Sequence, residues 1–213
     1  MTTADDTPVI GLRERKKLRT REAIAAAALD LFAAQGFGAT TIRQIAEAAD
    51  VAPRTVSGYF PVKEELVFPD HEQVFDRMAE RLTQREPGES AVDALRAWLI
   101  SFLDHDAMAD LEEFARRRQV IESDPALRIY ERGLQERAER VVAAAVAVDL
   151  GLPDSDLVPH MVGAATLAAL DAIGRQMAVG SARSYRRRAV ALIDEAMTFI
   201  GAGVAGLVAG SRP

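Results

Sequence analysis

Apolar residues recur along this chain at helical spacing, and the alternating pattern of exposed strands is absent. Gly and Pro fall between these amphipathic stretches, where they end helices. The spacing predicts nine helices, at about residues 12–35, 40–49, 53–60, 62–85, 90–104, 107–122, 124–149, 155–179 and 184–208. The expected fold class is therefore all-α, with a three-helix N-terminal head (1–61) and a six-helix C-terminal body (62–213).

Residues 40–60 have the pattern of a helix-turn-helix. Thr40 or Thr41 can cap the first helix, and Val51 supplies an apolar residue under the turn. Pro53 fits the first position of the second helix, because its φ is fixed at a helical value. The second helix of such a unit lies in the major groove of DNA and presents its N-terminal side chains to base edges. The matching residues here are Pro53, Arg54, Thr55 and Ser57.

The net charge of −6 argues against a nucleic-acid binder, but the distribution of charge does not. Six basic residues and one acidic residue lie between Arg13 and Arg21. Residues 1–70 hold nine basic and ten acidic side chains, and the rest of the chain holds 17 and 22. A basic cluster on a nearly neutral head can bind phosphates while an acidic body is repelled by them.

Composition and the absence of certain motifs exclude several classes of protein and of site. Apolar residues make up 49% of the chain and charged residues 27%, which fits neither a disordered nor a membrane protein. The chain has no cysteine, and its three histidines lie far apart. No motif of a catalytic triad, a phosphate-binding loop or a metal site is present. We therefore expect neither an enzyme nor a bound metal or cofactor, although a helical enzyme is a rival hypothesis.

The termini give no sign of export or of a membrane anchor. The N-terminus is acidic and polar, unlike a signal peptide. The longest apolar stretch near the C-terminus, Met197 to Ala209, is shorter than the ~18–20 residues that span a bilayer. A cytoplasmic protein is expected.

The head resembles the N-terminal motif of TetR-family transcriptional regulators over about residues 16–67. The resemblance rests on Arg21-Glu-Ala-Ile, Ala28-Leu-Asp-Leu-Phe, Gly36-Phe, Thr40-Thr-Ile, Ile45-Ala and Phe60-Pro-Val-Lys-Glu-Glu-Leu. It implies that Lys63 begins the fourth helix and binds a phosphate, and that Tyr59 contacts the DNA backbone. The predicted DNA-binding residues are thus Arg13, Lys16, Lys17, Thr41, Arg43, Pro53, Arg54, Thr55, Ser57, Tyr59 and Lys63.

Three positions depart from the family motif. Asp50 replaces the usual turn Gly, although Asp is able to adopt the left-handed conformation. Ala52 replaces a Ser or Thr cap, and Ser57 replaces an aromatic residue. The last change puts base recognition by this helix in question.

In the body, the run from Arg116 to Arg128 and the helix that begins near Tyr130 resemble the TetR subgroup that includes the mycofactocin-pathway regulator. That subgroup binds acyl-CoA-like ligands. The resemblance implies a small, partly apolar effector, with a pocket between the middle helices. Its predicted lining is Trp98, Phe102, Phe114, Arg117, Ile121, Tyr130, Leu134 and Met161, with Met108 and Met177 nearby. Trp, Met and Phe at helical spacing are also typical of an ordinary core.

The helices at 155–179 and 184–208 are rich in Ala and Gly, which permits close helix packing. The resemblance implies a homodimer through residues 155–208, whereas packing within one chain is the alternative. Together the patterns predict a regulator, most simply a repressor, that binds a palindromic double-stranded DNA operator as a dimer and is released by its effector. The alternative is a helical DNA-binding or protein-interaction module without an effector.

Overall fold

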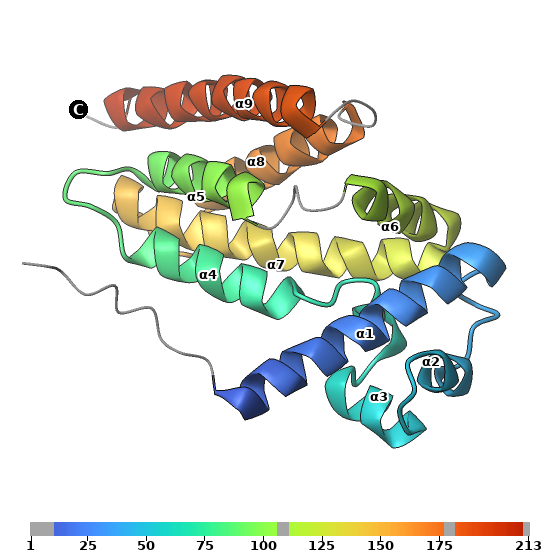
Figure 1. Ribbon diagram of the computed structural model, residues 1–213. Helices are drawn as coiled ribbons and strands as arrows, with labels where there is room; N and C mark the ends of the chain where they lie inside the picture. Colours follow the sequence, from blue (N-terminus) through green and yellow to red (C-terminus); the bar gives the residue numbers. More distant parts are fainter. Residues whose placement is uncertain (1–10, 106–110, 177–181, 211–213) are drawn as a thin grey trace, which may run out of the picture. The chain divides into compact units, whose positions relative to one another are not determined.

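The computed structural model describes residues 11–105, 111–176 and 182–210. Within these ranges the chain forms nine α-helices and one 3₁₀ helix, which confirms the all-α class. In chain order they are α1 (Leu12–Gln35), α2 (Ile42–Ala48), α3 (Pro53–Tyr59), η1 (Lys63–Leu66), α4 (His71–Thr83), α5 (Ala91–His105), α6 (Leu111–Ser123), α7 (Pro125–Leu150), α8 (Leu157–Gln176) and α9 (Ala182–Gly210) (Figure 1).

The helices fall into two compact units. The first contains Met1–Pro69 together with Gln119–Leu127, and the second contains Asp70–Arg118 together with Arg128–Pro213. This division differs from the boundary expected at 61/62. Leu66 and Val67 are fully buried in the core of the first unit, so the head continues beyond Pro61. The α6–α7 corner also contributes buried side chains to that core, namely Val120, Ile121 and Leu127.

The helix expected at 62–85 is divided in the structure. The 3₁₀ helix η1 ends at Leu66, and α4 begins only at His71. Pro69 explains the break, since it has no N–H to donate and disfavours helical geometry at the preceding Phe68. The 3₁₀ helix η1 and residues 67–70 therefore lie between α3 and α4.

In the first unit α2 and α3 pack against each other, and α1 packs against α2 and η1. The apolar residues of α1 that recur at helical spacing, including Ile24, Leu29 and Phe32, are buried in its core. Val51 also packs against this core, which confirms its expected place under the turn.

The turns of the head are built by local hydrogen bonds and two positive φ angles. Thr41 and Gln44 form a reciprocal capping box at the start of α2. Asp50 has a φ of 51°, so it adopts the left-handed conformation that the turn requires. Gly36 ends α1 with a φ of 87°, where a side chain would be strained. The sequence predicted a cap at Thr40 or Thr41, an Asp50 able to be left-handed and the end of the first helix near Gln35, but not the pairing of Thr41 with Gln44.

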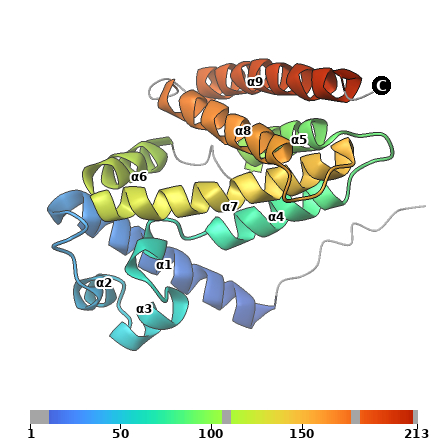
Figure 2. The same cartoon turned by 180° about the vertical axis from the view of Figure 1, so that it is seen from behind.

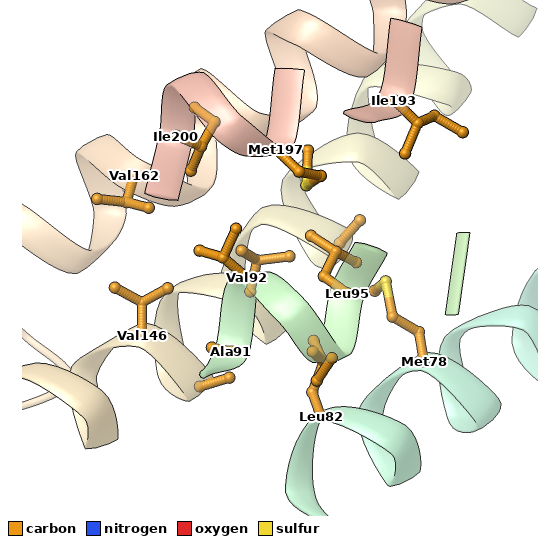
Figure 3. Packing of buried hydrophobic residues seen from close by; sticks show 14 of the residues in the cluster. Met78, Leu82, Ala91, Val92, Leu95, Val146, Val162, Ile193, Met197 and Ile200 are labelled. Carbon is orange, nitrogen blue, oxygen red and sulfur yellow. The ribbon is translucent and has the colours of Figure 1, made fainter. Parts of the chain in front are cut away.

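In the second unit α5 packs against α4 and against α9, and α8 also packs against α9. Figure 3 shows how this core is filled: side chains of α4, α5, α7, α8 and α9 point toward one another. Among them, Leu95 of α5 meets Met78 of α4 and Met197 of α9. The view from behind shows α7 beside α4 along much of the length of α4 (Figure 2).

Two helical windows of the second unit, Leu157–Arg175 and Tyr185–Leu207, are long and apolar enough to cross a membrane by length and composition. Only 17% of each window is buried inside the chain. Exposed apolar helices of this kind also occur where a protein packs against a partner, so length and composition alone are weak evidence for a membrane span.

Candidate nucleic-acid interface and ligand-binding body

Helix α3 has one buried face and one exposed face. Val56 is fully buried, and Phe60 at the end of the helix is 1% exposed. Pro53, Arg54 and Ser57 are exposed, and Thr55 is half-buried. The chain therefore fixes the helix through its apolar residues and leaves Pro53, Arg54 and Ser57 exposed, three of the four residues predicted to contact base edges.

A second group of predicted residues surrounds a polar hollow beside α3. The hollow has a volume of about 460 Å³ and is lined by Arg13, Glu14, Lys16, Lys17, Thr20 and Tyr59. All except Tyr59 come from the first turns of α1. Three basic side chains outnumber the single carboxylate of Glu14 around this hollow, so it suits an anionic oxygen, because ammonium and guanidinium groups form charge-assisted hydrogen bonds with phosphate.

Lys63 does not have the environment that the resemblance implied. Its Nζ donates a hydrogen bond of 2.5 Å to the carbonyl oxygen of Phe37 and lies 4.2 Å from the centroid of the Phe37 ring. Burial lowers the pKa of the Lys63 ammonium, while Glu64 and Asp124 act in the opposite direction. The ammonium thus holds the turn after α1 to η1, and the structure does not present it as a free phosphate ligand.

Two further predicted contacts lie at the start of α2. The hydroxyl of Thr41 donates to Gln44 Oε1 at 2.9 Å and accepts from the Gln44 backbone N–H at 3.3 Å. Arg43 is largely exposed and lies 3.6 Å from Glu47. Thr41 therefore has a defined structural task, whereas Arg43 is held only by a weak surface ion pair.

Arg21 is the last residue of the basic run in the sequence, but its side chain does not line the polar hollow with Arg13, Lys16 and Lys17. Its guanidinium points into the head, where Nη1 donates to the Tyr59 carbonyl at 2.8 Å and Nη2 donates to the Pro69 carbonyl. The sequence contains an indication of this structural role of Arg21, which counting charges does not detect. Arg21 precedes Ile24, Ala25 and Ala28 at helical spacing, on the face of α1 that is buried.

The predicted ligand-binding residues are only partly gathered together. The rings of Trp98 and Phe102, both residues of α5, stack with their centroids 5.4 Å apart. Trp98 and Leu134 pack against the core of the second unit. Tyr130 lies edge-on to His71. Met108 and Met177 lie outside the described residues.

Four others differ from the expected pocket. Ile121 belongs to the core of the first unit, because the α6–α7 corner packs there. Met161 is 58% exposed and Phe114 is 39% exposed, so neither is enclosed. Arg117 forms an ion pair with Glu113 one turn away on α6, which lowers its value for an anionic ligand.

The second unit also has an open groove that the sequence did not predict. Its volume is about 810 Å³, and its walls come from the α4–α5 loop, α5, α9 and Asp149. None of the predicted ligand-binding residues lines it. Two of its charged groups have partners outside the lining: Asp149 accepts from the Ala91 backbone N–H, and Arg96 pairs with Asp194.

Comparison with known proteins agrees with this two-part architecture. The family model described as bacterial regulatory proteins of the tetR family matches residues 24–68, and the MftR C-terminal domain matches residues 89–205. The regulator TcmR of Streptomyces glaucescens is 34% identical over 174 residues, or 78% of this chain and 74% of TcmR. The putative mycofactocin biosynthesis regulator MftR of Mycobacterium tuberculosis is 28% identical over 148 residues, or 70% of this chain and 74% of MftR.

Solved structures share the fold at low sequence identity. The complex of SmeT with triclosan has a TM-score of 0.59 at 20% identity, covering 84% of this chain and 90% of SmeT. The fatty acid degradation regulator FadR from Bacillus halodurans has a TM-score of 0.57 at 17% identity, covering 85% and 94%. The relatives are bacterial DNA-binding regulators, typically dimeric repressors with a ligand-binding C-terminal domain, and such proteins act in the cytoplasm. The chain belongs to the TetR family of bacterial transcriptional regulators, with an MftR-type C-terminal domain.

Proposed function

We propose that this protein is a ligand-responsive repressor that binds a palindromic operator as a homodimer and releases it when a small, partly apolar effector binds. One observation carries the proposal: the exposed face of α3 holds Arg54 and Ser57, and the polar hollow lined by Arg13, Lys16, Lys17 and Tyr59 opens in the same unit. The first face can read bases, and the hollow can hold the DNA backbone.

In this proposal the DNA contacts divide by task. Arg54 donates two hydrogen bonds to a guanine, and Thr55 and Ser57 contact neighbouring bases or phosphates. Arg13, Lys16, Lys17, Arg43 and Tyr59 bind phosphates and set the register of the head. Pro53 starts the helix, and Thr41 caps α2. Lys63 is left out of this set, because its ammonium is already bonded to Phe37.

The exposed apolar faces of α8 and α9 support dimerisation by a second copy. Leu157 and Met161 lie one turn apart on α8 and are 70% and 58% exposed, and Phe199 on α9 is 76% exposed. A helix-turn-helix head reads only a half-site, so two copies are needed for a palindromic operator. The interface proposed is residues 155–208.

The proposed effector is acyl-CoA-like, in line with the MftR-type domain at 89–205. Its acyl part would lie near Trp98 and Leu134, which already pack against the apolar core of the second unit, and near Phe102, which stacks on Trp98. The chain crosses between the two units at Pro69–Asp70 and again on either side of Gln119–Leu127. A change in the second unit would reach the first through these crossings, limited by the effector's differential affinity for the two states.

The test begins with selection of genomic DNA fragments by the purified protein. We expect enrichment of a palindrome, relaxed at one base position in Arg54→Ala and weakened on every sequence in Lys17→Gln. Arg132→Gln, which alters an exposed arginine of the second unit, is the control and keeps wild-type binding. Binding without sequence preference would favour the alternative, a helical DNA-binding or protein-interaction module.

A second experiment concerns the effector. Acyl-CoAs of increasing chain length are titrated into the protein–operator complex, with free coenzyme A as the control. Release that depends on the acyl chain supports the proposal. If acyl-CoAs bind to saturation and operator affinity stays the same, the ligand-responsive mechanism is wrong.

A further inference from the structure

Arg21 joins three segments of the head that lie far apart in the sequence. From α1 its guanidinium reaches the Tyr59 carbonyl at the end of α3, 38 residues away, and the Pro69 carbonyl, 48 residues away. It also lies 4.3 Å from the centroid of the Phe60 ring. Nη1 donates to the Tyr59 carbonyl oxygen at 2.8 Å, and Nη2 donates to the Pro69 carbonyl oxygen.

The guanidinium is committed to this internal task. Both terminal nitrogens donate to carbonyls, and Nε is buried without a hydrogen-bond partner among the described residues. Arg19, two residues earlier on α1, is exposed.

We propose that Arg21 is a positioning residue for operator recognition: it fixes the end of α3 relative to α1 and to the chain leaving the head at Pro69. The inference rests on the proposed reading of the operator by α3. A planar guanidinium is suited to this task because it holds two acceptors in a fixed fork and stacks on an aromatic ring. A lysine ammonium carries the same charge but not this geometry.

Tyr59 connects the hydrogen bonds of Arg21 with the proposed DNA contacts. Its carbonyl is held by Arg21, and its side chain lines the polar hollow with Lys16 and Lys17. Moving the end of α3 would therefore shift both the base-reading face and the backbone hollow. Errors of about 1 Å in such a contact set are enough to weaken recognition strongly.

The experiment compares Arg21→Lys and Arg21→Gln with Arg19→Lys and Arg19→Gln in the full-length protein. Operator affinity and affinity for scrambled DNA are measured by fluorescence anisotropy at several salt concentrations. Ala28→Gly, a helix-weakening change on the buried face of α1, serves as the control for lost stability. Circular dichroism checks that each variant is folded at the assay temperature.

We expect both Arg21 variants to lower the ratio of specific to nonspecific affinity by about tenfold or more, with the slope of log affinity against log salt unchanged. Arg19→Gln should reduce that slope by ~0.9 if Arg19 meets a phosphate, and Arg19→Lys should restore it. Rescue of selectivity by Arg21→Lys would overturn the inference, because charge alone would then suffice. Equal loss of selectivity in Ala28→Gly would overturn it as well, since stability would be the cause. A wild-type protein without selectivity refutes the proposed operator reading itself, and the inference with it.

Discussion

Gly163 of α8 lies so close to Glu139 of α7 that a Cβ at position 163 would stand 2.8 Å from the Glu139 carbonyl oxygen. It would also meet the Glu139 Cγ at 3.1 Å. Backbone cannot move aside as a flexible side chain can, so the close packing of these two helices depends on the missing side chain. A Cβ added at Gly174, further along α8, would meet no neighbouring atom within 4 Å.

Replacing these two glycines by alanine should have opposite effects on stability. Gly163→Ala is expected to lower the free energy of unfolding by about 1–3 kcal/mol, because the new methyl group forces α7 and α8 apart. Gly174→Ala should raise it by about 0.5–1 kcal/mol through helix propensity alone. Urea unfolding followed by circular dichroism measures both. Equal midpoints for the two variants would show that the helices are not closely packed at Gly163.

The capping box at α2 predicts how Thr41 acts. Thr41→Ala should lower the stability of the head by ~1 kcal/mol, because the Gln44 N–H loses its acceptor. Thr41→Ser keeps the hydroxyl and should be nearly neutral. Thermal unfolding of the three proteins distinguishes these outcomes. A Thr41→Ser protein with normal stability but weakened operator binding would instead indicate that the threonine methyl group contacts DNA.

Lys63 and Lys17 should differ in the salt dependence of DNA binding. Each phosphate contact contributes ~0.9 to the slope of log affinity against log salt. Lys17→Gln is therefore expected to reduce the slope by about that amount, whereas Lys63→Gln leaves it unchanged because its ammonium is bonded to the Phe37 carbonyl. Anisotropy titrations across a salt series make the comparison. A reduced slope in Lys63→Gln would mean that the ammonium turns to a phosphate when DNA binds.

The exposed side chain of Phe199 predicts the dimer interface. Phe199→Glu should convert the protein to a monomer, since a charge would be buried against the second copy. Val148→Glu is the matched control: Val148 is 70% exposed but lies on α7, outside residues 155–208. Sedimentation velocity reports the oligomeric state of both. A dimer that survives Phe199→Glu would place the interface elsewhere.

The pair formed by Glu72 and Arg137 predicts a pH dependence. A hydrogen bond from Arg137 at 2.7 Å lowers the pKa of the Glu72 carboxyl below its ordinary value of 4.5. A carboxyl whose pKa is lower in the folded state stabilises the fold above that ordinary value, and its contribution is lost as the pH falls through the folded-state pKa. Solvent screening keeps the contribution small, because half of the Glu72 side chain is exposed.

Glu72→Gln should therefore be slightly less stable than the wild type at pH 7, and the difference should be smaller at pH 3. Urea midpoints at the two pH values test this expectation. A difference that persists at low pH would mean that the two side chains stabilise the unit by packing, for example through the Arg137 guanidinium over the Phe75 ring, and not by charge.

Local features of the head could be predicted because neighbouring residues determine them. The Thr41 cap, the left-handed Asp50 and the buried face of α1 each follow from a short stretch of sequence. The interrupted helix at Pro69 was within reach of the same reasoning, because proline acts locally. It was missed because charges and leucines on both sides continue the helical pattern.

The sequence by itself determined the helical class, the helix-turn-helix and the basic start of α1, since periodicity and capping depend on residues a few positions apart. Only the tertiary structure decided which carbonyls Arg21 and Lys63 bond and that Ile121 belongs to the head. These facts depend on which carbonyls and apolar side chains a residue meets 26 to 48 positions away or across a packed core. A charge has the same identity in the sequence whether it faces solvent or a buried carbonyl, so only packing assigns its task.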